Sequence, residues 1–446
     1  MKLHLFGILL CSIVLLASCS KDPQPNVDDE LSQTLAAASP TGSIDYFKMP
    51  QGSDLSAIPQ DPKNPLTTDK INLGAMLYHE TGLALHPKHP ENEGAYSCSS
   101  CHFAGAGFQA GRHQAISDGG VGFGVNGEGR MPNPIYDPSE LDVQPLRSPS
   151  AMAMAWQEAT LWNGQFGATG VNAGTEAYWT PGTPIETNNL GYEGLETQAI
   201  AALNVHRMEV DDNPLITSAY KPMFDQAFPN VPESQRYTRE MAGLAIAAYE
   251  RSLLPNQSPW QRYLYGDLNA MTEQEKRGAK LFFGDAQCVK CHTGPALNSM
   301  EFYALGMKDL YECPEPTFGA DANSEANLGR YSFTKNDADK YKFKVPQLYN
   351  LADSPFYGHG SSFRTIREVI EYKNAAQKEN PNVPDSALAP EFTPLNLTAA
   401  EIDDLTAFIE HALRDPDLQR YQPIGVLSGN CFPDNDPQSR IDLGCN

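Results

Sequence analysis

The chain has 446 residues, enough for two ordinary domains. An apolar fraction of 41%, with 35 glycines and 35 prolines, indicates a globular protein whose helices are joined by long, turn-rich loops. The formal net charge of −23 argues against nucleic acid or an anionic membrane surface as a partner, and favours a basic partner protein instead.

The N-terminal sequence is typical of an export signal. An apolar run over residues 3–17 is short for a membrane span and ends in the letters LASC, where the cysteine is Cys19. This pattern resembles a bacterial lipoprotein signal. We expect residues 1–18 to be removed and Cys19 to be acylated, which anchors an exported protein on the periplasmic or outer face of a bacterial membrane. Residues 19–45 are polar and predict a flexible tether.

The first half of the chain combines one helix, a cysteine motif and a long loop. A helix ending in GAMLY at residues 74–78 precedes a C-x-x-C-H motif at residues 98–102. Residues 109–187 are rich in Gly, Pro and Asn and lack periodicity. A loop of that length is usually functional or wraps a cofactor. An apolar face then predicts a helix over residues 239–253.

The second half repeats this plan. A capping box, Thr272 with Glu275, begins a helix that contains GAKLF at residues 278–282, and a second C-x-x-C-H motif follows at residues 288–292. Two copies of one arrangement imply two domains of similar type, with a boundary near residues 255–271.

The C-terminal region holds one more helix and a tail with two cysteines. A capping box of Thr398 and Glu401 begins the helix, and an apolar stripe continues it to about residue 413. Outside the signal and the two motifs, three cysteines remain: Cys313, Cys431 and Cys445. In an oxidising compartment two of them would pair, most simply Cys431 with Cys445.

The C-x-x-C-H motifs predict covalent haem c. Each cysteine sulfur adds across a haem vinyl group, and the adjacent histidine supplies an axial nitrogen to the iron. A redox dithiol does not need the histidine, and zinc requires four ligands in a closed set. We therefore predict two covalently bound haems c, attached through Cys98, Cys101, Cys288 and Cys291, with His102 and His292 as metal ligands.

The order of further motifs resembles that of the bacterial dihaem cytochrome c peroxidase family, which includes the MauG-like enzymes. The resemblance extends from about Leu73 to Pro416. The segments that carry it are RSP at 147–149, LWNGQ at 161–165, LETQA at 195–199, AYERSL at 248–253, FKVPQLYN at 343–350 and SPFYGHG at 354–360.

The resemblance implies a mainly α fold of two cytochrome c-like helical domains with long loops. Residues 46–265 would hold the peroxidatic haem and residues 266–425 the electron-transfer haem, followed by a cysteine-containing tail at 426–446. A calcium ion would lie between the domains, and a homodimer is common in the family. Trp162 would lie between the haems, or be ordinary core packing. Gln198 would orient peroxide in the distal pocket, or be a solvated helix residue.

Two departures concern the first haem. The loop at residues 119–146 contains no histidine, so the sixth ligand of resting family members is absent and the iron is expected to be open; the nearby His113 is read as a surface group. The position of the family's distal glutamate falls on Arg207 or Met208. Glu209 would act as acid and base, or His206 would replace it, with Arg207 stabilising negative charge or pairing with a haem propionate.

A third departure concerns the second haem, whose sixth ligand in the family is Met or Tyr. The matching position is Lys373, with Tyr372 beside it, and Met307 is a further candidate. Burial lowers the pKa of a lysine and allows a neutral amine to bind iron, whereas a thioether raises the potential. The alternatives are a surface lysine, a packed tyrosine and a core methionine.

These observations predict an oxidoreductase that reduces hydrogen peroxide to water. Electrons from a donor protein, such as a small cytochrome or cupredoxin, would enter at the second haem and pass near Trp162 to the first. A MauG-like oxidase acting on a protein or organic substrate is the first alternative. A dihaem electron carrier without catalysis is the second.

Overall fold

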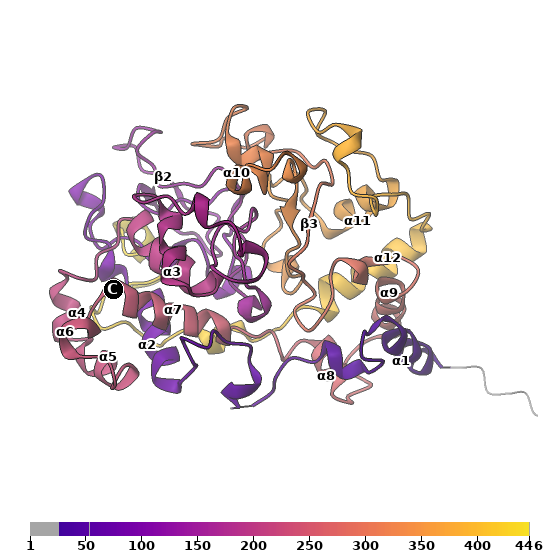
Figure 1. Ribbon diagram of the computed structural model, residues 1–446, viewed down its shortest axis with the longest axis horizontal. Coiled ribbons are helices and arrows are strands. Elements are labelled where there is room, and N and C mark those ends of the chain that lie inside the picture. The colour runs from indigo at the N-terminus through magenta and orange to yellow at the C-terminus, as the bar shows by residue number, and fades with distance from the viewer. Residues whose placement is uncertain (1–25, 53, 446) are drawn as a thin grey trace, which may run out of the picture.

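The computed structural model describes residues 26–52 and 54–445, which form a mainly helical protein (Figure 1). The predicted signal peptide and Cys19 lie outside these residues. The helices are α1 Val27–Ala38, α2 Thr68–Tyr78, α3 Gly194–Val205, α4 Pro214–Ser218, α5 Lys221–Ala227, α6 Glu233–Arg236, α7 Arg239–Ser252, α8 Pro259–Leu264, α9 Glu273–Phe283, α10 Tyr331–Thr334, α11 Ile366–Ala375, α12 Ala399–Ala407 and α13 Pro437–Asp442. Two short antiparallel pairs complete it: β1 Gly120–Val121 with β2 Met131–Pro132, and β3 Phe302–Tyr303 with β4 Phe343–Lys344.

Three of the helices predicted from the sequence are present, two of them with the predicted capping boxes. Helix α7 spans Arg239–Ser252 and is confirmed. The capping boxes of α9 and α12 are both present. The Thr272 and Thr398 side chains each accept from the backbone N–H three residues on, and the side chain of the glutamate at that position accepts from the backbone N–H of the threonine. The final turn after α12 loosens into a wider π-type turn at Phe408–Ala412.

The prediction of a flexible tether over residues 19–45 is wrong for its described second half. Residues 27–38 form α1, which Asn26 caps and which packs against α9. Leu31 and Leu35 are 0% and 1% exposed, because their spacing of four residues places both on one helix face. Ion pairs from Asp28 and Glu30 to lysines of α9 hold the outer face.

In the first half, α2 and α7 cross at a glycine. A Cβ atom at Gly74 would lie 1.9 Å from the Ala245 carbonyl oxygen, so only glycine permits this approach of the two backbones. Tyr78, at the end of α2, donates to the carbonyl of His102 at 2.9 Å and ties the helix to the first cysteine motif.

The second half repeats the crossing with α9 and α12. A Cβ atom at Gly278 would lie 2.0 Å from the Asp404 carbonyl oxygen. Gly74 and Gly278 are the first residues of the GAMLY and GAKLF segments, so the sequence repeat marks a repeated helix contact. In Figure 1, α2 and α7 lie together on one side of the molecule and α9 and α12 on the other.

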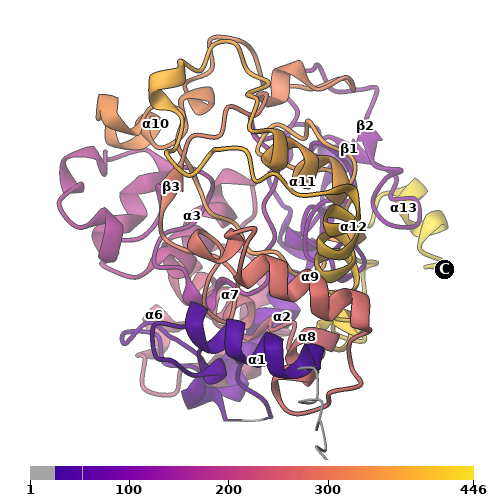
Figure 2. The same ribbon diagram turned by 90° about the vertical axis from the view of Figure 1, so that its right-hand side faces the viewer.

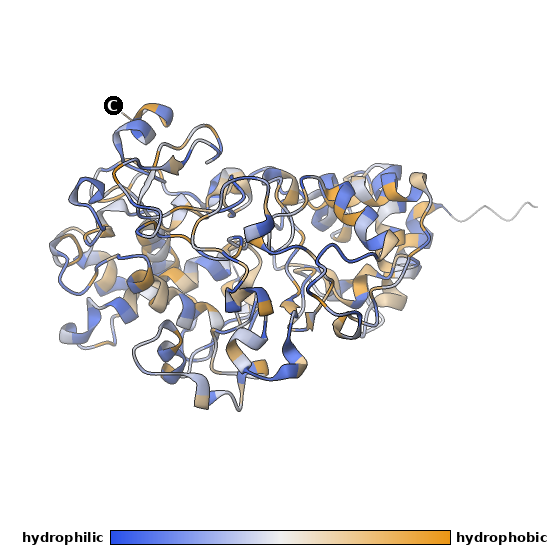
Figure 3. Ribbon diagram, turned by 90° about the horizontal axis from the view of Figure 1, so that it is seen from above, coloured by the Kyte–Doolittle hydropathy of each residue, from blue (hydrophilic) through white to orange (hydrophobic). Residues whose placement is uncertain are grey.

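Most of the buried apolar side chains form one cluster that includes residues of α1, α2, α3, α7, α9 and α12, and two small clusters lie in the loop that follows the first cysteine motif. The helices carry both hydrophobic and hydrophilic residues along their length, as expected when one face of each is buried (Figure 3). Among the residues described here, no helix is both long enough and apolar enough to cross a membrane.

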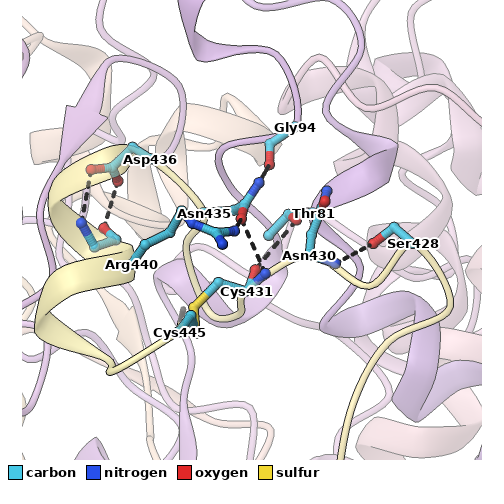
Figure 4. Close-up of a disulfide and its surroundings, with 10 residues drawn as sticks. Thr81, Gly94, Ser428, Asn430, Cys431, Asn435, Asp436, Arg440 and Cys445 are labelled. Atoms are coloured by element: carbon cyan, nitrogen blue, oxygen red, sulfur yellow. Dashed lines mark hydrogen bonds between the residues drawn. A yellow bond between two sulfur atoms is a disulfide. The ribbon is translucent and has the colours of Figure 1, made fainter.

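The C-terminal tail leaves the second half and returns to the first (Figures 1 and 2). Cys431 and Cys445 form a disulfide, which confirms the simplest predicted pairing, while Cys313 is a free thiol (Figure 4). The tail binds beside the first cysteine motif, where Ser97 donates to the Pro433 carbonyl at 2.8 Å. Arg130 forms a fully buried ion pair with Asp434 at 2.8 Å.

Candidate haem sites and distal residues

The two C-x-x-C-H motifs adopt the same turn. Each begins with a 3₁₀ turn, Cys98–Ser100 or Cys288–Lys290. In both, the first cysteine carbonyl accepts from the backbone N–H of the second cysteine and of the histidine, at distances of 2.9–3.2 Å. An antiparallel bridge closes the loop after each histidine. Identical turns place two thiols and one imidazole in the same relation twice, as a c-type haem requires.

Both histidines are oriented for metal binding through Nε2. His102 Nδ1 faces the Phe108 carbonyl at 3.3 Å, and His292 Nδ1 faces the carbonyls of Leu297 and Pro346 at 3.1 Å. Such a bond to the second nitrogen fixes the tautomer and the ring direction of a metal ligand. Burial lowers the pKa of each imidazole to about 4, so both are neutral at pH 7 and can bind iron.

A cavity of about 700 Å³ opens on the second motif. Its walls come from both halves of the chain. The first half contributes residues including Gln109, Arg147, Gln157 and Trp162, and the second contributes Cys288, Cys291, His292, Met307, Lys344 and Lys373. A space of this size and lining accommodates a porphyrin, and it brings residues from the long loop at 109–187 to the second motif.

Trp162 lies in this cavity wall between the two halves. Its Nε1 donates to the Arg147 carbonyl at 2.7 Å, and its carbonyl accepts from the Lys344 N–H at 2.8 Å. The ring makes an edge contact with His359, with ring centres 6.3 Å apart. The indole therefore joins segments of both halves at the edge of the predicted second haem.

The three candidate sixth ligands of the second haem differ in position. Lys373 and Met307 both line the cavity. The Lys373 side-chain amine forms no hydrogen bond or ion pair with the described residues, and burial lowers its pKa. Tyr372 instead packs between Phe363 and Phe392, and its hydroxyl donates to the Leu305 carbonyl.

Two buried cations in the cavity wall fit the anionic propionates of a haem. Arg147 and Lys344 are 3% and 6% exposed, yet within the described residues neither has a carboxylate partner. Arg147 donates to Gln109 Oε1 and Ser354 Oγ, its Nε is unpaired, and burial lowers its pKa to about 10. The Lys344 side-chain amine donates to Gln157 Oε1 alone, and burial lowers its pKa to about 7. Uncompensated buried charges are costly, so a bound anion would stabilise both.

Near the first motif, the predicted distal residues point in different directions. His206 Nδ1 bonds Asp142 Oδ2 at 2.8 Å. Arg207, with a φ of 57°, pairs with Asp118 and donates to the Glu140 carbonyl. Glu209 bonds His86 at 3.2 Å in a pair whose histidine is largely exposed. Gln198, on α3, is half-buried, and its amide forms no hydrogen bond with the described residues.

The expectation that His113 is a surface group is wrong. It is 4% exposed, and its Nε2 lies 2.9 Å from the Pro316 carbonyl of the second half. Ser361 donates to its backbone carbonyl. His113 therefore ties the long loop to the second half. Sequence reasoning missed this because the loop has no periodicity.

Sequence reasoning also missed Asp142 and the charge roles of Arg147 and Lys344. The RSP and FKVP segments that contain the two cations carry no local signal that either charge would be buried without a carboxylate partner. Among the residues that the structure describes, no group of three or more His, Cys, Asp or Glu side chains is placed to hold a metal ion. The calcium ion between the domains stays a prediction.

The helical fold and the duplicated C-x-x-C-H turn are the features expected of a c-type cytochrome. Residues 68–269 match the family described as di-haem cytochrome c peroxidase. Cytochrome-c peroxidase IdrP1 of Denitromonas iodatirespirans is 26% identical over 381 residues, 81% of this chain and 86% of the relative. Methylamine utilization protein MauG of Methylorubrum extorquens is 25% identical over 360 residues, 81% of this chain and 82% of the relative.

A solved structure agrees in fold. A MauG-like protein associated with microbial copper homeostasis superposes with a TM-score of 0.58 at 23% identity, covering 82% of this chain and 96% of that one. Over about four fifths of its length the chain is similar to dihaem cytochrome c peroxidases and MauG proteins, and these relatives support an oxidoreductase of the cytochrome c peroxidase type.

Proposed function

We propose that this protein binds two haems c covalently and reduces hydrogen peroxide to water with electrons from a donor protein. The observation that carries the proposal is the asymmetry of the two sites. The loop at 119–146 contains no histidine that could bind the first iron. Lys373 and Met307, in contrast, line the cavity beside the second motif, where either could be the sixth ligand of the second iron. An iron with an open position reacts, and one with two ligands relays electrons.

The residues of the chain have distinct tasks in this proposal. His102 and His292 would bind the irons, and bound haem would supply the one-electron redox chemistry. Arg147 and Lys344 would neutralise the propionates of the second haem. Lys373, whose amine has no other partner among the described residues, would be the sixth ligand there. Trp162 would form part of the electron path between the sites.

The location and partners form a second part of the proposal. Export and a lipid anchor on Cys19 would place the enzyme on the periplasmic or outer face of a bacterial membrane, where covalent haem and the Cys431–Cys445 disulfide are compatible with an oxidising environment. The net charge of −23 favours a basic donor, such as a small cytochrome or cupredoxin. A calcium ion between the domains and a homodimer belong to the same expectation.

The test is steady-state turnover of purified holoprotein with a reduced small cytochrome. Denatured protein should carry the mass of two haems, and two donor molecules should be oxidised for each peroxide consumed. Negligible turnover, with a new spectrum that forms when peroxide is added and is stable in the absence of donor, would favour the MauG-like oxidase. Purely low-spin spectra with no binding of cyanide or peroxide would favour the electron carrier.

A further inference from the structure

His206 is held in place by a buried carboxylate. It caps the end of α3, where its backbone N–H donates to the Ala202 carbonyl at 2.8 Å. Asp142, which accepts its Nδ1 proton at 2.8 Å, is 7% exposed, and its own backbone is fixed by bonds to Asp118 and Ser117 at 2.9 and 3.0 Å. A histidine with Nδ1–H on a fixed carboxylate has a defined tautomer and a defined ring direction.

The other ring nitrogen is free. The His206 side chain is 30% exposed, and Nε2 has no hydrogen-bond partner among the described residues. The pair also lies beside the first motif, because the hydroxyl of Tyr96, two residues before Cys98, donates to the carbonyl of Arg207, the residue after His206, at 3.4 Å. The uncommitted nitrogen therefore belongs to the surroundings of the predicted first haem.

The rival groups are already engaged. The Glu209 carboxylate bonds His86 and also accepts from the Val210 N–H at 2.8 Å. The Arg207 guanidinium is bound to Asp118 and to the Glu140 carbonyl. The Glu209 carboxylate cannot accept a proton without weakening these contacts, and the Arg207 guanidinium stays protonated, whereas His206 presents a free ring nitrogen.

We propose that His206, positioned by Asp142, is the acid and base of the peroxide site, in place of the glutamate that the family carries. This inference rests on the proposed function. His206 Nε2 would take one proton from the proximal oxygen of HOOH and return it to the distal oxygen as the O–O bond breaks, so that the distal oxygen leaves as water. Two electrons from the donor protein and two protons from solvent convert the remaining oxygen to the second water.

The charges around His206 are consistent with this role. Burial disfavours the imidazolium, but the charge and hydrogen bond of Asp142 outweigh it and raise the His206 pKa above its ordinary value, while Arg207 opposes them. Burial likewise disfavours the Asp142 carboxylate, and His206 and Arg207 reverse that effect and lower its pKa. The charged neighbours of the imidazole are thus Asp142 and Arg207, and the titratable His102 nearby is neutral at pH 7.

The experiment compares cyanide binding to ferric holoprotein in His206→Gln, Asp142→Asn and His86→Gln variants. Hydrogen cyanide must lose a proton when it binds iron, so its association rate reports the distal base independently of peroxide turnover. His206→Gln should slow association about 10²-fold or more, the usual contribution of a positioned acid or base. Asp142→Asn should slow it less, about 10-fold, because the imidazole remains but is wrongly oriented. His86→Gln, which removes a surface histidine paired with a carboxylate, should leave the rate unchanged.

Haem content and melting temperature establish that each variant is folded, and Asp142→Asn carries the test alone if His206→Gln does not accumulate. Unchanged cyanide rates in His206→Gln and Asp142→Asn would overturn the inference. A wild-type protein without peroxide turnover, but with cyanide binding slowed by both substitutions, would support the pair and reject the peroxidase proposal. The two failures are therefore distinguishable.

Discussion

Replacing Gly74 with alanine tests the repeated helix crossing. The added Cβ atom would lie 1.9 Å from the Ala245 carbonyl oxygen and 2.9 Å from the Tyr249 Cβ. Ordinary van der Waals contact begins at 3.4 Å, so α2 and α7 must separate by more than 1 Å. Overpacking of this kind costs roughly 3 kcal/mol. Since each kcal/mol lowers the melting temperature of a domain by at least about 2 °C, the expected loss is about 6 °C or more.

The assay is thermal unfolding of the holoprotein, followed by circular dichroism. Gly278→Ala should give a similar loss, because its Cβ atom would lie 2.0 Å from the Asp404 carbonyl oxygen in the equivalent crossing. Gly425→Ala is the matched control, since no atom lies within 4 Å of its added Cβ. Melting temperatures within 1 °C of wild type for Gly74→Ala and Gly278→Ala would refute the close approach of both helix pairs.

Three further predictions concern the buried carboxyl, the tail and the second haem. Burial raises the pKa of Glu250 from 4.5 in the unfolded chain to about 8 in the folded protein. Between these two pH values the carboxyl ionises in the unfolded chain but stays protonated in the folded protein, so the free energy of unfolding falls as the pH rises from 4.5 to 8. Glu250→Gln should therefore gain about 3 kcal/mol at pH 7 and nothing at pH 4, and urea unfolding that shows an equal difference at both would contradict this. Replacing Cys431 and Cys445 by serine should cost about 3 kcal/mol, since they close a 14-residue span, and should make the tail sensitive to proteolysis; an unaltered digestion pattern would argue against it. Lys373→Ala should convert the second haem to high spin by EPR, whereas Met307→Leu should not, and the reverse result would identify the methionine as ligand.

Local sequence signals predicted the regular parts of this fold. Capping boxes located the starts of α9 and α12, and the repeated GAMLY and GAKLF segments marked equivalent helix crossings. The cysteine spacing also predicted two equivalent turns. These features depend on residues close in the chain, so the sequence contains the whole pattern.

Contacts between distant loops were not predictable in the same way. His206 and Asp142 are 64 residues apart, and His113 and Pro316 are 203 apart. Both contacts involve loop segments that have no hydrophobic periodicity. In such segments the sequence predicts only that polar residues are exposed to solvent. The α1 helix was missed for another reason: its polar composition resembles a linker, and only the burial of Leu31 and Leu35 against α9 distinguishes it.

The most direct test of the account is rapid optical mixing of the fully oxidised holoprotein with one equivalent of hydrogen peroxide. The loop at 119–146 holds no histidine that would have to leave the first iron. We therefore expect an immediate spectral change at a high-spin haem without prior reduction, and a return to the starting spectrum as two electrons arrive from the reduced donor. A protein that remains unchanged by peroxide until the second haem is reduced would contradict the assignment of an open iron at His102.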